Sequence, residues 1–273
     1  MSGNSHVSVI ITTYNQPEWL RKTLLGFEQQ DTSNFEVIIA DDGSRSETSA
    51  VIQSYKERNI LDITHVWHPD TGFNKCAILN KAILASKFDY LLFTDGDCIP
   101  RKDFVSVHLR KAQKGRFLSG GYFKLNNDIS NLLTDTDIEK QEPFRVKWLL
   151  SNGQPFTYKL LKFVGNQLLQ NLLNLLTVTK PTWNGHNVSG WKCDIIAVNG
   201  YNEDMQYGGL DRELGERLEN FGVYGKQIRY SAVCVHLDHP RPYRTNDTLS
   251  KNRAIRDRVK LQRIVWAENG IVK

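Results

Sequence analysis

The chain has few cysteines, no long apolar run and no strong excess of either charge. Its four cysteines are widely spaced and form no Cys-x-x-Cys pair, which indicates buried thiols in a reducing compartment rather than a disulfide framework or a zinc site. No apolar run reaches the roughly 18 residues that a transmembrane helix needs. The polar N-terminus gives no sign of a signal peptide. We expect a cytoplasmic protein, with peripheral attachment to the inner face of the cytoplasmic membrane left open.

Charge and composition also limit the class of protein. The 273 residues include 35 Lys and Arg and 30 Asp and Glu, for a net charge of +5. This mild excess suits anionic small molecules or an anionic membrane surface, and it is too diffuse to indicate nucleic acid. The length allows one large α/β domain, with or without a small appendage.

The first hundred residues alternate between strand-like and helix-like patterns. The β-branched run Val7–Thr12 predicts a buried strand, and Pro17 then opens a segment with apolar residues at helical spacing. Further strands are expected at 35–40, 63–68 and 90–94, and further helices through Val51 and Tyr55 and at 77–85. This alternation predicts a doubly wound, mixed but mostly parallel sheet flanked by helices.

Three polar clusters follow expected strands, at 12–15, at 41–42 and at 95–97. Ligands of doubly wound sheets bind at the carboxyl ends of the strands. In the triplet Asp95-Gly96-Asp97, two carboxylates one residue apart suit a divalent cation, which prefers hard oxygen ligands. Each cluster alone fits an ordinary solvated turn, but three at one sheet edge favour a nucleotide pocket.

These segments resemble a known family. Val-Ser-Val-Ile-Ile-Thr-Thr-Tyr-Asn at 7–15, Val-Ile-Ile-Ala-Asp-Asp-Gly-Ser at 37–44 and the Asp-Gly-Asp strand end are similar to family 2 glycosyltransferases of the GT-A fold. The segment from Gly185 through Asp204 to Leu214 resembles a galactosyltransferase-type carboxyl-terminal segment. The resemblance implies one GT-A domain over 1–273, with a nucleotide-binding half at 1–120, a helical insert at 121–181, an acceptor and catalytic half at 182–240 and a basic tail helix at 241–273.

The resemblance implies a UDP-sugar donor. Asp42 would accept a hydrogen bond from uracil, with helix capping as the alternative role. Many relatives carry Arg-Asn where this chain has Leu79-Asn80, so a basic contact is either lost or supplied by Lys75 or Lys81. The nucleotide-binding residues expected from the family pattern are Thr12, Tyr14, Asn15, Asp42, Lys75, Asn80, Asp95 and Gly96.

The family pattern also implies a metal ion, Mn²⁺ or Mg²⁺, at the leaving diphosphate. Asp97 is the expected direct ligand, and Asp95 would bind the ribose or the metal through water. Relatives often add a histidine from a late strand. Here His236 is the first candidate and His239 its rival, while a lone histidine at a strand end is also common as a hydrogen-bonding residue.

The catalytic base that the resemblance implies is Asp211. The family's Gly-Gly-Glu-Asp reads Gly208-Gly209-Leu210-Asp211 here, so the acid that commonly contacts the acceptor is missing. A position at the start of a helix should favour the ionised form of Asp211, and helix capping is the alternative role.

Four further residues are candidates for contact with the transferred sugar. His186 and Asn187 match the donor-sugar side of the family segment, and Trp183 and Trp191 could stack on a sugar face. Core aromatic residues are the equally good interpretation of the two tryptophans. The expected sugar site consists of His186, Asn187, Trp191, Gly208 and Gly209.

The insert breaks the strand–helix alternation. Leucines between 160 and 176, with Lys159 and Lys162 nearby, predict an amphipathic helix. It would either pack on its own domain or dock on a membrane that carries a lipid-linked acceptor. The basic tail, with a helix expected at 250–266, would close over the diphosphate, contact anionic lipid or form a solvated face.

Together these features predict a metal-dependent glycosyltransferase that moves a sugar from UDP to a hydroxyl of a glycan or lipid-linked saccharide. Bacterial surface polysaccharide or lipopolysaccharide synthesis is the process that the family suggests. Inversion is expected, although the galactosyltransferase-type segment also occurs in a retaining family. The alternatives are a sugar nucleotidyltransferase, whose glycine-rich basic first loop is missing here, and a non-catalytic nucleotide-binding protein.

Overall fold

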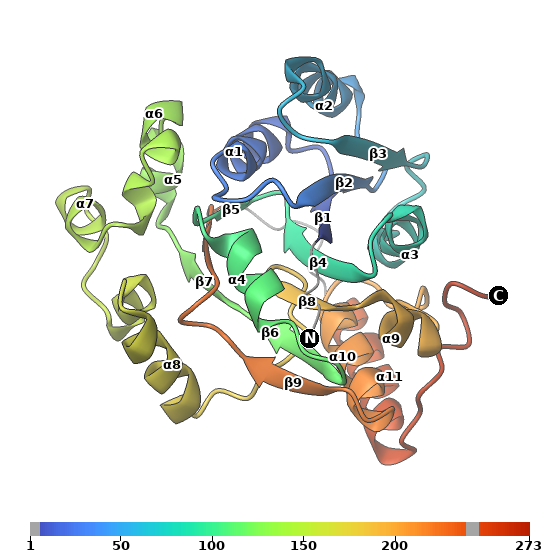
Figure 1. Cartoon of the computed structure of the whole chain (residues 1–273). Helices are drawn as coiled ribbons and strands as arrows, with labels where there is room; N and C mark the ends of the chain where they lie inside the picture. The colour runs from blue at the N-terminus through green and yellow to red at the C-terminus, as the bar shows by residue number, and fades with distance from the viewer. Residues whose placement is uncertain (1–5, 239–245) are drawn as a thin grey trace.

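The computed structural model describes residues 6–238 and 246–273. Its main sheet has seven strands in the order β3-β2-β1-β4-β8-β6-β9 (Figure 1). All strands run in one direction except β8, which is antiparallel to both of its neighbours. The strands are β1 (Val7–Thr13), β2 (Phe35–Asp41), β3 (Ile63–Trp67), β4 (Tyr90–Asp95), β6 (Arg116–Ser119), β8 (Val188–Trp191) and β9 (Tyr224–Gln227). The sheet expected from the sequence is confirmed.

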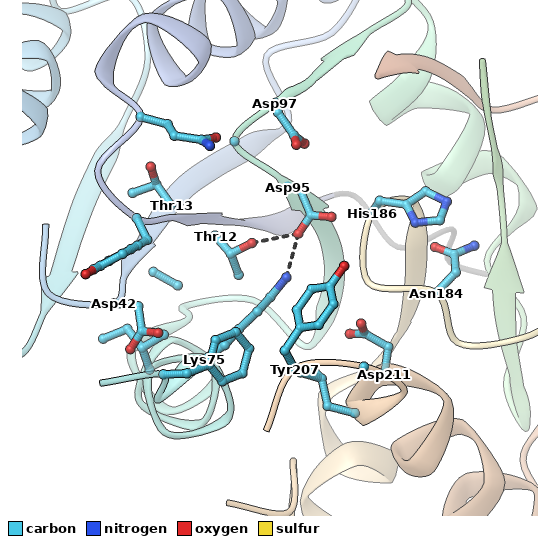
Figure 2. Close-up of a pocket in the computed structure, with 18 of the residues that line it drawn as sticks. Thr12, Thr13, Asp42, Lys75, Asp95, Asp97, Asn184, His186, Tyr207 and Asp211 are labelled. Carbon is cyan, nitrogen blue, oxygen red and sulfur yellow. Dashed lines mark hydrogen bonds and ion pairs between the residues drawn. The ribbon is translucent and has the colours of Figure 1, made fainter. Parts of the chain in front are cut away.

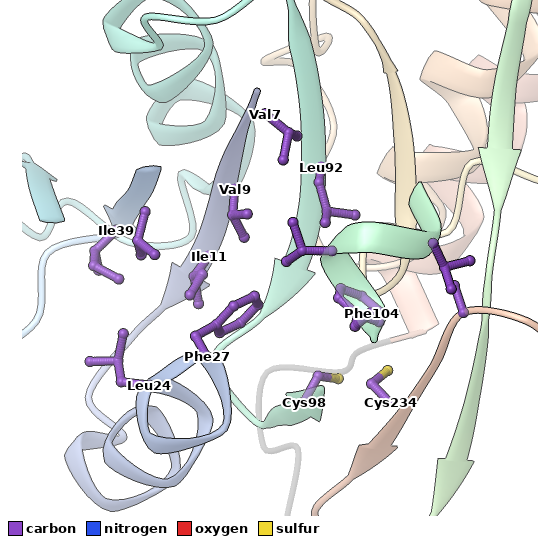
Figure 3. Packing of buried hydrophobic residues seen from close by; sticks show 14 of the residues in the cluster. Val7, Val9, Ile11, Leu24, Phe27, Ile39, Leu92, Cys98, Phe104 and Cys234 are labelled. Atoms are coloured by element: carbon purple, nitrogen blue, oxygen red, sulfur yellow. The ribbon is translucent and has the colours of Figure 1, made fainter. Parts of the chain in front are cut away.

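Alternation along β1 places apolar residues on both faces of the sheet, because successive side chains of a strand point to opposite sides. Val9 and Ile11 pack in one buried cluster with residues of α1, α2 and α4 (Figure 3), and Ile10 packs in another with α3, α9 and α10. Helices therefore cover both faces. They are α1 (Pro17–Glu28), α2 (Ser46–Arg58), α3 (Lys75–Ala85), α4 (Phe104–Lys111), α9 (Lys192–Ala197) and α10 (Leu210–Asn220).

A second, three-stranded sheet lies at the end of β4. Its central strand, β10 (Val233–His236), pairs with β5 (Cys98–Pro100) on one side and β7 (Gly121–Lys124) on the other. The register places His236 opposite Cys98, immediately after the Asp95–Asp97 turn. This small sheet therefore places β10, a strand near the end of the chain, beside the turn that contains Asp95 and Asp97.

The insert folds as short helices over a third buried cluster that includes Phe123, Ile129 and Leu149. The single helix expected over 159–176 is wrong. Leu160 is buried within a 3₁₀ turn, and the Asn166 side chain caps a separate helix by accepting the Leu169 N–H. The elements are α5 (Asn127–Leu132), α6 (Asp135–Glu139), η1 (Glu142–Phe144), α7 (Val146–Ser151), η2 (Tyr158–Phe163) and α8 (Gln167–Leu176).

The tail helix α11 (Asn246–Leu261) begins earlier and ends earlier than the sequence suggests. Arg256 and Lys260 both form ion pairs with Glu216 of α10, so part of its basic side faces the protein. Asn252 is buried and donates to the carbonyls of Gln206 and Gly208. Helix α11 thus holds the loop that leads into α10. No helix in the described part of the chain is both long enough and apolar enough to cross a membrane.

Candidate active site

A cavity of about 480 Å³ lies at the carboxyl ends of β1, β2 and β4. Figure 2 shows its polar side chains converging from both halves of the chain, with Asp95 near the centre. Such a concave site with a few converging polar groups is typical of ligand pockets. Its lining includes Thr12, Thr13, Tyr14, Gln16, Asp42, Phe73, Lys75, Asp95, Gly96, Asp97, Tyr122, Asn184, His186, Tyr207, Gly208, Gly209, Leu210, Asp211 and His236.

Asp42 lies on the wall beside Tyr14. His68 Nε2 is 2.7 Å from one carboxylate oxygen of Asp42, and the Asn74 N–H donates to the other at 3.0 Å. Burial raises the pKa of Asp42, while these two contacts oppose the rise. Asp42 does not cap α2, which begins after Arg45 without a side-chain cap; its neighbour Asp41 accepts the Ser44 N–H within the turn. Asp42 is therefore held in place from behind and faces the cavity.

Lys75, at the start of α3, is the cation of the pocket. Its Nζ lies 2.7 Å from Asp95 Oδ1, and the Thr12 hydroxyl donates to the same oxygen at 2.8 Å. Burial alone would raise the pKa of Asp95, but the adjacent Lys75 charge holds it well below its usual range. Of the two lysines that could replace the missing arginine, Lys75 enters the cavity and Lys81 faces His68 instead.

Asp97 and His236 lie together on the opposite wall. His236 Nδ1 is 2.7 Å from the Leu237 carbonyl, where only a protonated nitrogen can bond, so in the neutral ring Nε2 carries the lone pair. That Nε2 lies 3.5 Å from Asp97 Oδ2. Asp97, His236 and Cys98 are the one group of three potential metal ligands found among the described residues. A carboxylate and an oriented imidazole on one side of a cavity fit a divalent cation.

Asp95 is not part of that group, and Lys75 and Thr12 both donate to one of its carboxylate oxygens. Gly96 lets the chain turn between the two carboxylates. Its N–H donates to the Thr12 carbonyl, and a Cβ at this position would come within 2.9 Å of that oxygen. His239 lies outside the described residues.

Asp211 lies on the floor of the cavity, in the first turn of α10. Gly209 begins the helix with a φ of +86°, so the capping role expected as the alternative for Asp211 belongs to Gly209. Burial raises the pKa of Asp211 to about 6, with the positive charge of Lys75 opposing the rise. The start of the helix was expected to favour the ionised form of this carboxyl; burial acts in the opposite direction and has the larger effect, although a pKa of about 6 still leaves the group mostly ionised at neutral pH.

Aromatic side chains also line the cavity, and the sequence analysis did not identify them as site residues. Tyr207 packs edge-on against Phe73 at 6.1 Å, and Tyr122 packs against His186 at 4.5 Å and His236 at 5.7 Å. Burial lowers the pKa of His186 to about 4, so this residue is neutral. The position of Tyr207 directly before Gly208 and Gly209 could have identified it as a site residue from the sequence. No sequence pattern marks Tyr122 or Asn184 as site residues.

Several residues expected in the site lie outside it. Trp183 is buried and donates to Tyr201, and Trp191 donates to the Gln113 carbonyl, so both are core aromatics. Asn80 is buried and bonds to the backbone of Tyr201. Asn15 does not line the cavity either; its side chain accepts the Arg45 N–H.

Asn187 is also a structural residue rather than a sugar contact. It is fully buried, accepts from His108 Nε2 at 2.9 Å and donates to the carbonyls of Gly121 and Ala232. We expect Asn187→Ala to lower the free energy of unfolding by roughly 2 to 4 kcal/mol, because three buried partners lose their hydrogen bonds. Chemical denaturation measures this loss. A change in UDP affinity of the folded protein without loss of stability would contradict it.

The comparisons with known proteins agree with this architecture. Residues 8–163, more than half of the chain, match the family model "Glycosyl transferase family 2", and the chain belongs to this family. The family favours glycosyl transfer over a nucleotidyltransferase or a non-catalytic binding protein.

Two curated relatives show the range of similarity. Chondroitin synthase of Escherichia coli is 25% identical over an alignment of 258 residues, which covers 86% of this chain and 35% of that protein. The uncharacterized glycosyltransferase YfnE of Bacillus subtilis is 26% identical over an alignment of 274 residues, which covers 90% of this chain and 68% of YfnE. The chain spans about a third or less of the first three chondroitin and hyaluronan synthases it matches.

Solved structures share the fold. S. aureus TarS 1-349 in complex with UDP-GlcNAc has a TM-score of 0.66 and 14% identity, over 96% of this chain and 67% of that chain. Mannosyltransferase PcManGT from Pyrobaculum calidifontis, in complex with GDP-Man and Mn²⁺, has a TM-score of 0.60 and 18% identity, over 89% and 59% of the two chains. The sheet and its flanking helices are those of a GT-A glycosyltransferase.

Proposed function

We propose that this family 2 glycosyltransferase uses a UDP-sugar and a divalent metal ion, and that it transfers the sugar with inversion to an acceptor hydroxyl. The observation that carries the proposal is the convergence of four groups on one cavity. Asp42, the Lys75–Asp95 pair, Asp97 with His236, and Asp211 all line it. Strands from both halves of the chain share the main sheet, in keeping with one GT-A domain.

The uracil would lie against Asp42, beside Thr12 and Tyr14. Each carboxylate oxygen has two lone pairs, so Asp42 can accept the uracil N–H while it keeps its bonds to His68 and Asn74. The Tyr14 hydroxyl donates to Asp70 at 2.8 Å, which fixes its ring on the cavity wall. These contacts hold the Asp42 carboxylate in one position, where it can accept a hydrogen bond from uracil.

The diphosphate would lie between Lys75 and the pair Asp97 and His236. A divalent cation held by Asp97 and His236, Mn²⁺ or Mg²⁺, would neutralise the charge of the leaving UDP. Lys75 would contribute a second positive charge from the other side of the cavity, in place of the arginine that relatives carry at position 79.

Asp211 would be the base of the transfer. Its carboxylate takes the proton of the acceptor hydroxyl, the acceptor oxygen forms a bond to the anomeric carbon, and the bond from that carbon to the diphosphate breaks. Attack opposite the leaving group inverts the anomeric centre. Tyr122, His186 and Tyr207 would exclude water around the reacting atoms.

The acceptor would be a hydroxyl of a glycan or a lipid-linked saccharide in bacterial surface polysaccharide or lipopolysaccharide synthesis. Support comes from the chondroitin and hyaluronan synthases among the relatives, which are polysaccharide-forming by name. Leu210 is buried in the core and replaces the family's acidic residue, so the acceptor would be oriented by other groups, among them Asn184.

The pH dependence tests the role of Asp211. Burial raises the pKa of Asp211 to about 6, and only the ionised carboxylate can accept a proton. We therefore expect kcat/KM to rise with pH around a midpoint near 6. Lys75→Met removes an attraction that lowers this pKa, so the midpoint should move to higher pH. Lys75→Arg retains the charge and should leave the midpoint in place. A midpoint that falls in Lys75→Met would contradict the assignment.

A donor screen tests the proposed function. UDP-sugars and GDP-mannose are incubated with the protein, with and without Mn²⁺, and sugar release is measured. We expect metal-dependent hydrolysis of one UDP-sugar and no turnover of GDP-mannose. Early NMR spectra of the product should show the anomer opposite to that of the donor. Preference for the guanine nucleotide would refute the uracil site, and a retained anomer would refute inversion.

A further inference from the structure

Helix α8 presents its polar side to the protein. Gln170 is buried and donates to the Val164 carbonyl at 2.8 Å. Asn174 donates to the Ser231 hydroxyl and accepts the Tyr230 N–H, and Asn171 accepts from Lys111. These bonds fix the rotation of the helix. A surface helix of a globular protein normally has the opposite arrangement, with its apolar stripe toward the core.

The leucines of α8 consequently face outward. Leu168 is 80% exposed, Leu172 49%, Leu175 81% and Leu176 65%, at spacings that place them on one side of the helix. We call these four residues the leucine face. In Figure 1, α8 lies at the periphery of the molecule, on the side of the edge strand β9. The neighbouring segments add exposed apolar side chains, namely Leu150, Phe156, Tyr158, Leu161 and Val178.

The segment around the leucine face carries positive charge only. No Asp or Glu occurs between Glu142 and Asp194, whereas a stretch of that length would hold about five or six at the average content of this chain. Lys147, Lys159 and Lys180 are exposed within it. Exposed apolar residues on a helix, with lysines and no acids around them, are the combination that binds an anionic lipid surface.

We propose that the leucine face of α8 docks on an anionic lipid bilayer. The charge pattern favours a bilayer over a second copy of the chain, because the acids needed to pair with these lysines are missing from the face itself. The docking does not depend on the chemistry of the pocket, although it would serve a lipid-linked acceptor.

The leucine face is connected to the pocket through the preceding turn. Lys162 of η2 is buried, donates to the Tyr122 carbonyl and lies 5.5 Å from the centre of the Tyr122 ring. Tyr122 lines the cavity beside His186 and His236. The segment that leads into α8 therefore contacts a residue of the cavity wall directly.

Vesicle sedimentation tests the proposal. The full chain is mixed with vesicles of phosphatidylcholine and phosphatidylglycerol, and with vesicles of phosphatidylcholine alone. We expect binding to the anionic vesicles that weakens with salt. Leu168→Ser with Leu172→Ser should reduce the apparent affinity by about tenfold or more. The matched control, Leu84→Ser with Leu261→Ser, removes two exposed leucines from α3 and α11 and should bind as the wild type does.

Melting temperature, UDP-sugar hydrolysis and sedimentation velocity then distinguish a bilayer from a second copy of the chain as the partner of the leucine face. The Leu168 and Leu172 variant should keep its melting temperature and its UDP-sugar hydrolysis, because both side chains lie outside the core. A lowered melting temperature, or vesicle binding equal to that of the wild type, would overturn the proposal. So would the absence of vesicle binding in the wild type. A dimer in sedimentation velocity that the variant dissociates would assign the face to a second copy instead.

Discussion

Asp211→Asn should lower turnover by about 100-fold or more with little change in UDP affinity. The amide keeps the size and shape of the carboxylate but cannot take a proton from the acceptor at neutral pH. Asp211 lies on the cavity floor, and its pKa, raised to about 6, is closer to neutral pH than that of an ordinary carboxyl, as suits a general base. Steady-state kinetics and UDP binding, measured on the same preparation, check the prediction.

The matched control is Asp194→Asn, which changes a carboxylate in the first turn of α9, outside the cavity. It should leave both turnover and UDP affinity unchanged. If Asp211→Asn instead weakens UDP binding while the rate at saturating donor is normal, Asp211 is a donor ligand and the base must be sought elsewhere.

Asp97→Ala should abolish transfer and remove the part of UDP affinity that depends on metal. Its carboxylate lies 3.5 Å from His236 Nε2, and without it the proposed divalent cation loses a ligand, so that Lys75 alone remains to offset the charge of the diphosphate. Turnover gives the first measurement. The second is the electron paramagnetic resonance signal of free Mn²⁺, which the wild-type protein with UDP should reduce further than UDP alone does, whereas the variant with UDP should match UDP alone.

Asp128→Ala, which removes an exposed carboxylate from α5, is the control for net charge and should behave as the wild type does. Turnover near the wild-type level in a folded Asp97→Ala protein would place the metal site elsewhere or make it unnecessary.

The sheet could be predicted because local patterns determine it. The β-branched runs at Val7–Thr13 and Phe35–Asp41 pair in parallel, residue for residue, so that Thr13 lies opposite Asp41. Parallel strands end at one edge, which is why Thr12, Asp42 and Asp95 meet in one cavity although they are far apart in the sequence.

The failures concern residues whose partners are distant in the sequence. Asn187 looks like a sugar ligand by its position in the motif, yet its partner His108 comes from 79 residues away and holds it in the core. Asn80 is bound to Tyr201 by a contact of the same kind, over 121 residues. No local pattern contains this information. The orientation of α8 was equally hidden, because its leucine spacing fits either an inward or an outward face.

Calorimetric titration of UDP, with and without Mn²⁺, tests the central claim most directly: the cavity lined by Asp42, Lys75, Asp97 and His236 is a metal-assisted UDP site. We predict one UDP per chain and an affinity at least about tenfold higher with Mn²⁺, since the cation neutralises the diphosphate. Uridine, which lacks the diphosphate, should bind weakly and equally in both conditions. No binding of UDP, or an affinity that is the same with and without the metal, would contradict the account.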